Sequence, residues 1–332
     1  MSPKAVWILA EQREGKVADV SYELITRGRE LADQRDTELC AVILGDNLSD
    51  AELQTLIDRG CDRVLHASAP ELRHFLPEPY DKCLQALIVK EQPEILIAAA
   101  TSTGRTVMPC VAGTLRAGLT ADCTGLQIEA DTGNLLQTRP AAGGNIMATI
   151  KTPERRPQMA TVRPHSTRPA PSISGRTGRI DRWQPPADLL KSRVRRVDYT
   201  PAVETQAIQD ADVVVAVGRG FKKADNVELA RKLANVLDGA VGASREAVDR
   251  GWLPYPAQVG LSGKTVSPKL YIAVGVSGTV QHLAGMQTSE TIIAINSDSE
   301  APIFNYAEIG LCGDLFTLLP MLTAKIAAAK QS

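Results

Sequence analysis

The sequence lacks the features that mark disulfide-rich and zinc-binding proteins. It has only 6 cysteines in 332 residues, at positions 40, 61, 83, 110, 123 and 312, and no two of them form a Cys-x-x-Cys pair. Its 4 histidines do not cluster with the cysteines. We therefore expect no metal site and no disulfide framework, but reduced and mostly buried thiols of the kind found in cytoplasmic proteins.

An excess of charge of either sign is also absent. Lysine and arginine total 37, aspartate and glutamate total 38, and the net charge is −1. Without surplus positive charge there is no broad electrostatic basis for binding nucleic acid or an anionic membrane. The arginines between residues 153 and 179 are not interleaved with aromatic residues that could stack on bases, so this stretch is interpreted as a solvated connection.

Long apolar runs are missing as well. No run approaches the roughly 20 residues that a membrane-spanning helix needs, so no direct membrane insertion is expected. The first apolar segment, AVWILAE, is too short for a signal peptide and is followed by charged residues. We therefore expect an untargeted bacterial or archaeal protein that stays in the cytoplasm.

The sequence does contain two successive alternations of short apolar runs and amphipathic segments. A chain of 332 residues exceeds the roughly 250 to 300 that one core serves, so we expect two domains, residues 1–200 and 201–332. Strands are expected at 5–10, 39–44, 64–66, 95–100, 212–217, from 241, 269–274 and 291–295, and helices at 20–35, 50–59, 80–91, 106–115, 226–237 and 313–329. This rhythm predicts two α/β domains, each a mostly parallel sheet flanked by helices, the C-terminal one doubly wound.

Three stretches of the first half interrupt this alternation. Residues 101–105, TSTGR, form either a ligand-binding loop or a helix start capped by Ser102 or Thr103. Gly133 is expected in a hairpin turn, and the segment LLQTRPAAGGNIMATI is expected to be one strand interrupted by Gly143 and Gly144, as a bulge or close backbone approach would require. Residues 153–201, rich in Pro and Arg, are interpreted mainly as a connecting strap with an edge strand at most.

Small and polar residues follow every expected strand of the second half. They are Gly218 to Gly220, Ser244 with Arg245, Ser277 to His282, Asn296, and Gly313 with Asp314. The carboxyl ends of parallel strands meet at one edge, so these residues should share one crevice. Arginines, hydroxyls, an imidazole and helix-start amides together suit a phosphate-bearing dinucleotide. The fingerprint G-x-G-x-x-G is absent, which argues against an ordinary NAD-binding domain.

The same residues resemble a known family. The segments VGRG, GASREAVDRGW, QVGLSGKTVSPKLYIAVGVSGTVQHLAGM, TIIAINSDSEAPIF and GDLFTLLP, within residues 217–319, resemble the alpha subunit of electron-transfer flavoproteins. The resemblance covers almost the whole C-terminal domain, whereas the N-terminal domain fits more loosely. It implies one FAD in the C-terminal domain and a beta subunit in contact with the N-terminal domain. It also implies single-electron transfer through an anionic semiquinone between a flavin dehydrogenase, such as an acyl-CoA dehydrogenase, and an acceptor.

The family's FAD contacts fall on matching positions of this sequence. They are Arg219, Ser244, Arg245, Val259, Gly260, Leu261, Ser262, Ser277, Gly278, Thr279, Val280, Gln281, His282, Asn296, Asp314 and Leu315. The resemblance places Arg245 against the isoalloxazine and His282 near its pyrimidine carbonyl. Ser262 would direct its hydroxyl toward N5, where many relatives have threonine. No catalytic acid, base or nucleophile is implied, so the chain is not expected to be an enzyme on its own.

Two segments of the first domain, GLTADCT (118–124) and TRPAAGGNIMATI (138–150), resemble the branch of the family that performs electron bifurcation. In that branch a second FAD, held by the beta subunit, splits the electron pair of NADH, and ferredoxin or flavodoxin can be an acceptor. Three alternatives remain open at this point. They are a non-bifurcating flavoprotein with AMP in its beta subunit, an NAD-dependent oxidoreductase that uses His282 as acid or base, and a nucleotide-binding regulatory module.

Overall fold

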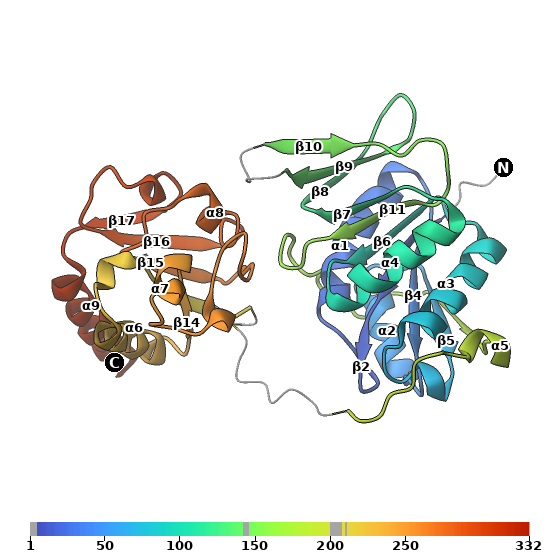
Figure 1. The fold of residues 1–332 in the computed structure, drawn as a ribbon, viewed down its shortest axis with the longest axis horizontal. Coiled ribbons are helices and arrows are strands. Elements are labelled where there is room, and N and C mark those ends of the chain that lie inside the picture. Colours follow the sequence, from blue (N-terminus) through green and yellow to red (C-terminus); the bar gives the residue numbers. More distant parts are fainter. Residues whose placement is uncertain (1–4, 142–145, 200–207, 210, 332) are drawn as a thin grey trace. The chain divides into compact units, whose positions relative to one another are not determined.

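The computed structural model describes residues 5–141, 146–199, 208–209 and 211–331. The described chain divides into two compact units (Figure 1). One comprises residues 5–141 and 146–199, and the other begins at residue 208. The predicted α/β class is confirmed, because each unit contains a parallel sheet flanked by helices.

Seven parallel strands form the main sheet of the first unit, in the order β12-β5-β4-β1-β6-β11-β7. Their bounds are β1 (Val6–Ala10), β4 (Leu39–Gly45), β5 (Arg63–Ser68), β6 (Ile95–Ala99), β7 (Leu119–Cys123), β11 (Gln158–Val162) and β12 (Arg179–Trp183). A small hairpin, β2 (Gln12–Arg13) with β3 (Lys16–Val17), follows β1.

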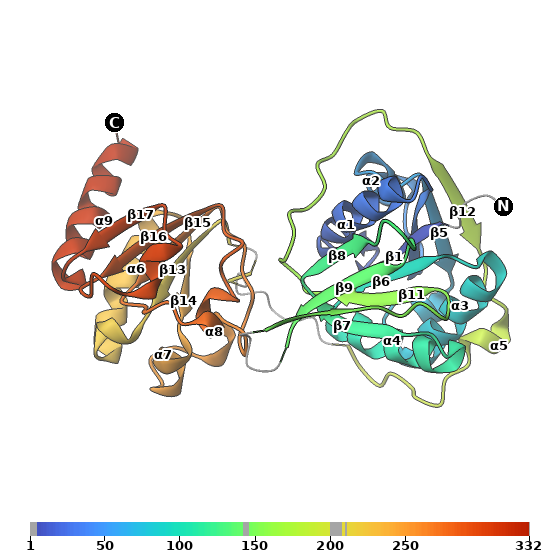
Figure 2. The ribbon, with the colours of Figure 1, turned by 90° about the horizontal axis from the view of Figure 1, so that it is seen from above.

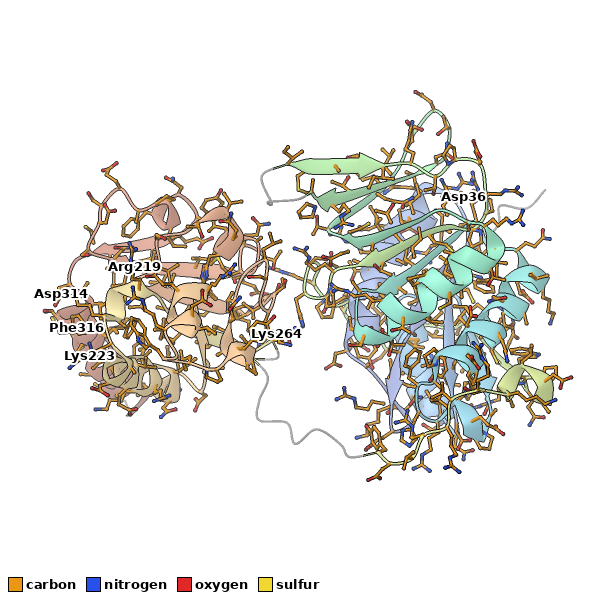
Figure 3. All side chains as sticks on the ribbon, in the orientation of Figure 1. Asp36, Arg219, Lys223, Lys264, Asp314 and Phe316 are labelled. Atoms are coloured by element: carbon orange, nitrogen blue, oxygen red, sulfur yellow. The ribbon has the colours of Figure 1, made fainter. Side chains whose placement is uncertain are left out.

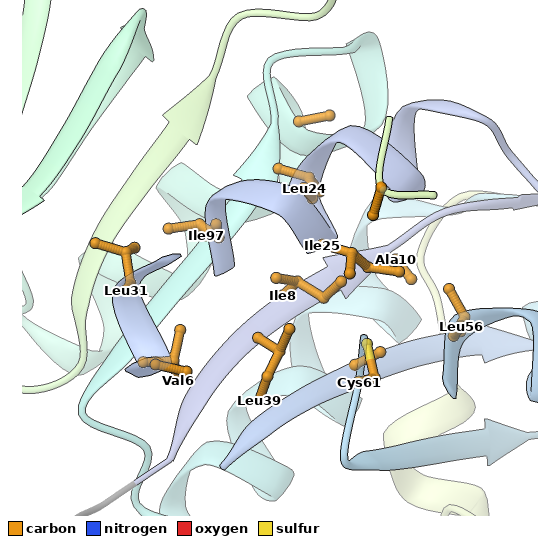
Figure 4. Close-up of a cluster of buried hydrophobic side chains, with 14 of the residues drawn as sticks. Val6, Ile8, Ala10, Leu24, Ile25, Leu31, Leu39, Leu56, Cys61 and Ile97 are labelled. Carbon is orange, nitrogen blue, oxygen red and sulfur yellow. The ribbon is translucent and has the colours of Figure 1, made fainter. Parts of the chain in front are cut away.

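Helices cover both faces of this sheet (Figure 2). One face carries α1 (Val20–Gln34) and α2 (Asp50–Asp58), and the other carries α3 (Pro77–Glu91) and α4 (Ser102–Leu115). Because side chains alternate along a strand, Val6, Ile8 and Ala10 of β1 pack toward α1 (Figure 4), whereas Trp7 and Leu9 pack toward α3 and α4. Two short pieces, η1 (Pro70–Leu72) and α5 (Ala187–Leu190), complete the unit.

A second sheet of this unit is antiparallel, in the order β10-β9-β8. Its strands are β8 (Gly125–Ile128), β9 (Leu135–Pro140) and β10 (Met147–Ile150). Gly133, with φ +67°, lies in the β8–β9 turn, as predicted. The prediction of one interrupted strand after it is wrong, because Met147 pairs with Pro140 and the chain has reversed direction. Gly143 and Gly144 lie outside the described residues.

The prediction for the Pro- and Arg-rich stretch 153–201 is correct in part, because β12 is an edge strand of the seven-stranded sheet. Residues 158–162 form β11, a fully buried strand between β6 and β7, and not a connection. Its buried polar side chains have partners far along the chain: Gln158 Oε1 accepts from the Leu135 N–H at 2.9 Å, and Thr161 Oγ1 accepts from the Asp122 N–H at 2.9 Å. Because these partners come from distant parts of the chain, the local sequence does not show that the polar side chains can be buried. The segment was therefore not predicted as a central strand.

The polar segment at 101–105 is the first turn of α4. Thr101 is the N-cap, and its hydroxyl accepts a hydrogen bond from the Gly104 N–H at 3.1 Å. The helix start is therefore capped, but by Thr101 and not by Ser102 or Thr103, because only Thr101 has the extended backbone that an N-cap residue adopts.

Five parallel strands form the sheet of the second unit, in the order β14-β13-β15-β16-β17. They are β13 (Val213–Val217), β14 (Ala240–Ala243), β15 (Leu270–Val274), β16 (Thr291–Asn296) and β17 (Ile309–Cys312). The edge strand β17 was not predicted, because its pattern is largely exposed and contains Gly310 and Cys312. The chain runs from β13 outward to β14 and then crosses to β15 on the other side of β13, which makes the unit doubly wound.

Helices α6 (Val227–Val236) and α9 (Leu315–Gln331) cover one face of this sheet. The other face packs against a loop around residues 259–266, the short helix α8 (Val280–Leu283) and η5 (Pro302–Asn305). Short helical pieces η2 (Arg219–Phe221), η3 (Ala224–Asn226), α7 (Arg245–Asp249) and η4 (Tyr255–Ala257) lie in the connections. No helix in the described part of the chain combines the length and apolarity needed to cross a membrane.

Candidate functional site

The loops after β13 and β15 meet at the point where the strand order of the second sheet reverses. The Gly220 N–H donates to the Gly275 carbonyl at 3.1 Å. A Cβ on Gly218 would lie 2.0 Å from that carbonyl oxygen, and one on Gly220 would lie 2.8 Å from the Gly275 Cα. Glycine is therefore required on both loops by direct backbone contact. Ligands of open α/β sheets bind beside such a switch point, outside the carboxyl ends of the strands.

A cavity of about 380 Å³ lies at this edge, next to the end of β14. Three segments line it: the start of α7, a loop at 258–262, and the start of α8. The lining residues are Ser244, Arg245, Gln258, Val259, Gly260, Leu261, Ser262, Thr279, Gln281 and His282. Nine of these ten belong to the predicted set, so positions far apart in the sequence do meet in one place.

Backbone contacts hold the loop 258–262 in position. The Val259 N–H donates to the Ala243 carbonyl at 2.8 Å, which ties the loop to β14, and the Leu261 N–H donates to the Gln281 carbonyl at 2.7 Å, which ties it to α8. Gly260 has φ +142°, and a Cβ there would lie 2.9 Å from the Gln281 oxygen. The cavity wall is thus built from a loop that only glycine at 260 allows to approach α8.

Two buried polar atoms in the cavity wall have no hydrogen-bond partner. They are Ser244 Oγ and His282 Nδ1, and within the described part of the second unit they are the two side-chain atoms of this kind. A buried polar atom left unsatisfied costs about 1–3 kcal/mol. Ser244 is also the residue before α7, where a side-chain oxygen would normally cap the helix, yet it does not. Both atoms are suited to hydrogen bonds with a polar ligand, and the residues present therefore fit a dinucleotide such as FAD.

His282 is held by a residue that the sequence did not single out. Its Nε2 lies 2.9 Å from the hydroxyl of Tyr271 on β15, and both side chains are buried. Burial lowers the pKa of His282 to about 4, against the smaller opposing effect of the Val259 carbonyl. The imidazole is therefore neutral at pH 7 and can act on a ligand through a hydrogen bond, not through a fixed charge.

Positive charge at the cavity comes from Arg245. Its side chain is 73% exposed, and its one ion pair among the described residues joins Nε to Asp249 Oδ2 at 3.4 Å, which is long for a charge-assisted bond. The guanidinium can therefore turn to a ligand at small cost. It is the first residue of α7, so it also lies at the helix end where anions are favoured.

Ser262 is oriented by Gln258, the one lining residue absent from the predicted set. The Gln258 Nε2 donates to Ser262 Oγ at 3.1 Å. Because the hydroxyl oxygen accepts this bond, its hydrogen remains available to a ligand. Gln258 is buried, and a polar residue next to a glycine-containing loop was the signal that could have identified it.

The other predicted residues do not line the cavity. Four of them, Ser277, Gly278, Val280 and Leu315, shape or flank the loops at this edge. Asn296 braces the loop after β15, since its Nδ2 donates to the Val276 carbonyl at 2.9 Å and its Oδ1 accepts from the Asp298 N–H at 3.0 Å. Each atom of its amide group thus makes one hydrogen bond within the protein.

The charged members of this group are spread along the same edge of the sheet. Arg219 is 72% exposed, and its Nη1 lies 3.7 Å from Glu246 Oε2. The Asp314 carboxylate accepts from the Thr317 hydroxyl at 3.1 Å. Figure 3 shows Asp314 on the opposite side of this unit from Lys264, which follows the cavity loop 258–262 by two residues. A ligand that touched all the predicted residues would have to be extended along the sheet edge, and their role in binding stays a prediction.

Comparison with known proteins agrees with these features. Residues 6–188 match the family described as "Electron transfer flavoprotein domain", and residues 207–287 match "Electron transfer flavoprotein FAD-binding domain". The second match contains all ten residues that line the cavity.

Several curated proteins are similar along nearly the whole chain. An "Electron transfer flavoprotein subunit alpha" of Thermoanaerobacterium thermosaccharolyticum is 44% identical, over 98% of this chain and 99% of its own length. An "Acryloyl-CoA reductase electron transfer subunit beta" of Anaerotignum propionicum is 39% identical, over 98% and 96%. The "Lactate dehydrogenase (NAD(+),ferredoxin) subunit LctC" of Acetobacterium woodii is 39% identical, over 97% and 77%. The chain therefore belongs to the electron transfer flavoprotein alpha-subunit family, and its cofactor is FAD.

Proposed function

We propose that this chain carries FAD in its second unit and passes single electrons between a flavin dehydrogenase and an acceptor, within an NADH-linked electron-bifurcating complex. One observation supports the assignment of FAD to this cavity. Two buried atoms without partners, Ser244 Oγ and His282 Nδ1, lie in its wall together with the exposed guanidinium of Arg245. Bound FAD would supply the one-electron chemistry, because its ring can accept and release electrons one at a time.

The residues of the cavity have distinct roles in this proposal. Arg245 provides positive charge where reduction places negative charge on the ring, and His282 provides a neutral hydrogen bond there. Ser262, with its oxygen held by Gln258, offers a hydroxyl hydrogen to the ring. None of these groups has to act as an acid, base or nucleophile. The chain is therefore a carrier subunit and not an enzyme on its own.

The bifurcating assignment has two supports. The segments 118–124 and 138–150 resemble that branch of the family, and the relative from Acetobacterium woodii is named for both NAD⁺ and ferredoxin. In this proposal a beta subunit contacts the first unit and holds a second FAD. The partners would be a flavin dehydrogenase, such as an acyl-CoA dehydrogenase, and ferredoxin or flavodoxin. The relative named for acryloyl-CoA reductase supports an acyl-CoA-linked partner.

The second candidate is a simple electron-transfer flavoprotein with AMP in its beta subunit. It is favoured by relatives whose names mention electron transfer alone, such as the one from Thermoanaerobacterium thermosaccharolyticum. An NAD-dependent oxidoreductase has less support, because the sequence has no G-x-G-x-x-G fingerprint for a nicotinamide dinucleotide.

Purification of the chain with its beta subunit tests the proposal. Two FAD molecules per heterodimer, with reduction by NADH, are expected for the bifurcating protein. One FAD and one AMP would establish the simple flavoprotein instead. A heterodimer without flavin absorbance, which also takes up no added FAD, would refute both.

A further inference from the structure

The contact between Tyr271 and His282 determines more than the position of the imidazole. Tyr271 lies on β15 with none of its surface exposed, and its hydroxyl is 2.9 Å from His282 Nε2. The two ring centroids are 6.1 Å apart at 57°. Within the described residues the structure gives the Tyr271 hydroxyl no other hydrogen-bond partner.

Two arrangements of hydrogens are compatible with this contact. In the first, the phenol O–H donates to Nε2, and the imidazole proton resides on Nδ1. In the second, Nε2–H donates to the phenol oxygen, and the phenol hydrogen has no acceptor among the described residues. The first arrangement leaves one buried group, Nδ1–H, without a partner, whereas the second leaves two, the phenol hydrogen and the Nδ1 lone pair. Burial therefore disfavours the second arrangement, because each unsatisfied buried polar group is costly. The first should exceed the second by on the order of tenfold or more.

Both groups keep the protonation state that this reasoning requires. Burial raises the pKa of the Tyr271 phenol well above its ordinary value, so its O–H is present at any physiological pH. Burial also lowers the pKa of His282 to about 4, so the ring carries one proton and not two. A neutral imidazole with an acceptor at Nε2 has its proton at Nδ1.

We propose that Tyr271 is a positioning residue that holds His282 as the Nδ1–H tautomer and so leaves Nδ1–H as the hydrogen-bond donor available to FAD. The proposal rests on the proposed function only for the identity of the acceptor. Nδ1 makes no hydrogen bond within the described protein, although the Val259 carbonyl is close enough to the ring to oppose the lowering of its pKa, and His282 lines the cavity. Tyr271 itself does not line the cavity and acts through the imidazole.

Nitrogen NMR of the imidazole rings tests the tautomer directly. The full chain, labelled with ¹⁵N-histidine and assembled with unlabelled beta subunit and FAD, contains only 4 labelled rings. Resonances of His282 are identified by their loss in His282→Gln. The expected result at pH 7 is a protonated Nδ1 and an unprotonated, hydrogen-bonded Nε2. A protonated Nε2 in the wild-type protein would overturn the proposal.

Two tyrosine variants distinguish positioning from a general effect of losing a hydroxyl. Tyr271→Phe removes the donor to Nε2, and we expect the share of the Nε2–H tautomer to rise on the order of tenfold. Tyr255→Phe is the matched control, because its hydroxyl donates to the Ser262 carbonyl at 2.9 Å and does not contact His282. It should leave the His282 resonances unchanged. An unchanged tautomer in Tyr271→Phe, or an equal change in both variants, would contradict the proposal.

The tautomer and the cofactor assignment can fail separately. The same spectra recorded on the cofactor-free heterodimer should already show Nδ1–H, since the Tyr271 hydroxyl and the Val259 carbonyl act on the ring without FAD. If FAD binds at this cavity, its addition should shift the Nδ1 resonance of His282 while Nε2 changes little. A correct tautomer with no response to FAD would retain the role of Tyr271 in orienting the ring and refute the hydrogen bond to FAD.

Discussion

Replacement of Arg245 by alanine should lower the potential of the first one-electron reduction of the bound FAD. The guanidinium lines the cavity and is 73% exposed before the cofactor binds. Two unit charges about 4 Å apart interact by about 1 kcal/mol in water and about 4 kcal/mol at an effective dielectric constant near 20. Because Arg245 lies toward the solvent side, we expect a loss of about 1–2 kcal/mol, or about 40–90 mV for one electron.

Arg250, the C-cap residue of α7, offers a charge-matched control. Arg250→Ala also removes one positive charge, but the Arg250 Nη2 is paired with Glu246 Oε1 at 2.8 Å, and the residue does not line the cavity. Screening by water and salt should reduce its effect to a small fraction of that of Arg245→Ala. Asp249→Asn should shift the potential slightly upward, because it removes the carboxylate that partly neutralises Arg245.

Spectroelectrochemical titration of the purified heterodimer measures these shifts, with FAD content determined for each variant. The expected order of first-electron potentials places Arg245→Ala lowest, Arg250→Ala close to the wild type, and Asp249→Asn above it. Equal potentials for the two arginine variants would refute the reasoning, since the effect would then come from overall charge.

Three further predictions concern other parts of the chain. Gly218→Ala should lower the free energy of unfolding by about 3 kcal/mol or more, because the new Cβ would lie 2.0 Å from a backbone oxygen. The control Gly251→Ala should lower it by only about 1–2 kcal/mol, because that residue lies in open space and only its φ of +72° is unfavourable for alanine. Thermal unfolding of the two variants measures the difference. Burial raises the pKa of Glu23 from 4.5 to about 7, so the folded state binds this proton more tightly than the unfolded state does, and stability is lost as the pH rises between these values. Glu23→Gln should remove this loss of about 3 kcal/mol, which denaturant titrations at several pH values measure. Parallel pH profiles for the two proteins would contradict the prediction. Gln258→Leu and Ser262→Ala should shift the flavin potential non-additively, because Gln258 acts through the Ser262 hydroxyl. If the shift in the double variant equalled the sum of the two single shifts, the hydrogen bond between these side chains would have no influence on the potential.

Much of the second unit could be predicted because its strands are short, continuous apolar runs that end in glycine or polar residues. Val213–Val217 and Leu270–Val274 are strands of this kind, and being central they are apolar on both faces. The parallel order then brought their following loops to one edge. The edge strand Ile309–Cys312 was missed, because exposure leaves an edge strand without the apolar pattern that marks a central one.

The first unit shows the opposite failure. Gln158–Val162 is a fully buried central strand, yet two of its five residues are polar and it follows a Pro- and Arg-rich segment. Its polar groups are satisfied by Leu135 and Asp122, more than twenty residues away. A local pattern cannot reveal such partners, because hydrogen-bond satisfaction of a buried group depends on the completed fold.

The amino-acid order alone was enough to determine the α/β class and the set of small and polar positions where strands end, because both follow from local periodicity and from glycine at obligatory places. Tertiary packing decided which of those positions share a cavity and which buried neighbour binds the imidazole nitrogen of His282. It also decided which side chains, such as Asn296, make hydrogen bonds that hold a loop in place. These depend on distances between residues far apart in the chain, and Tyr271, an apolar-patterned strand residue in the sequence, acquires its role only when β15 and α8 are packed together.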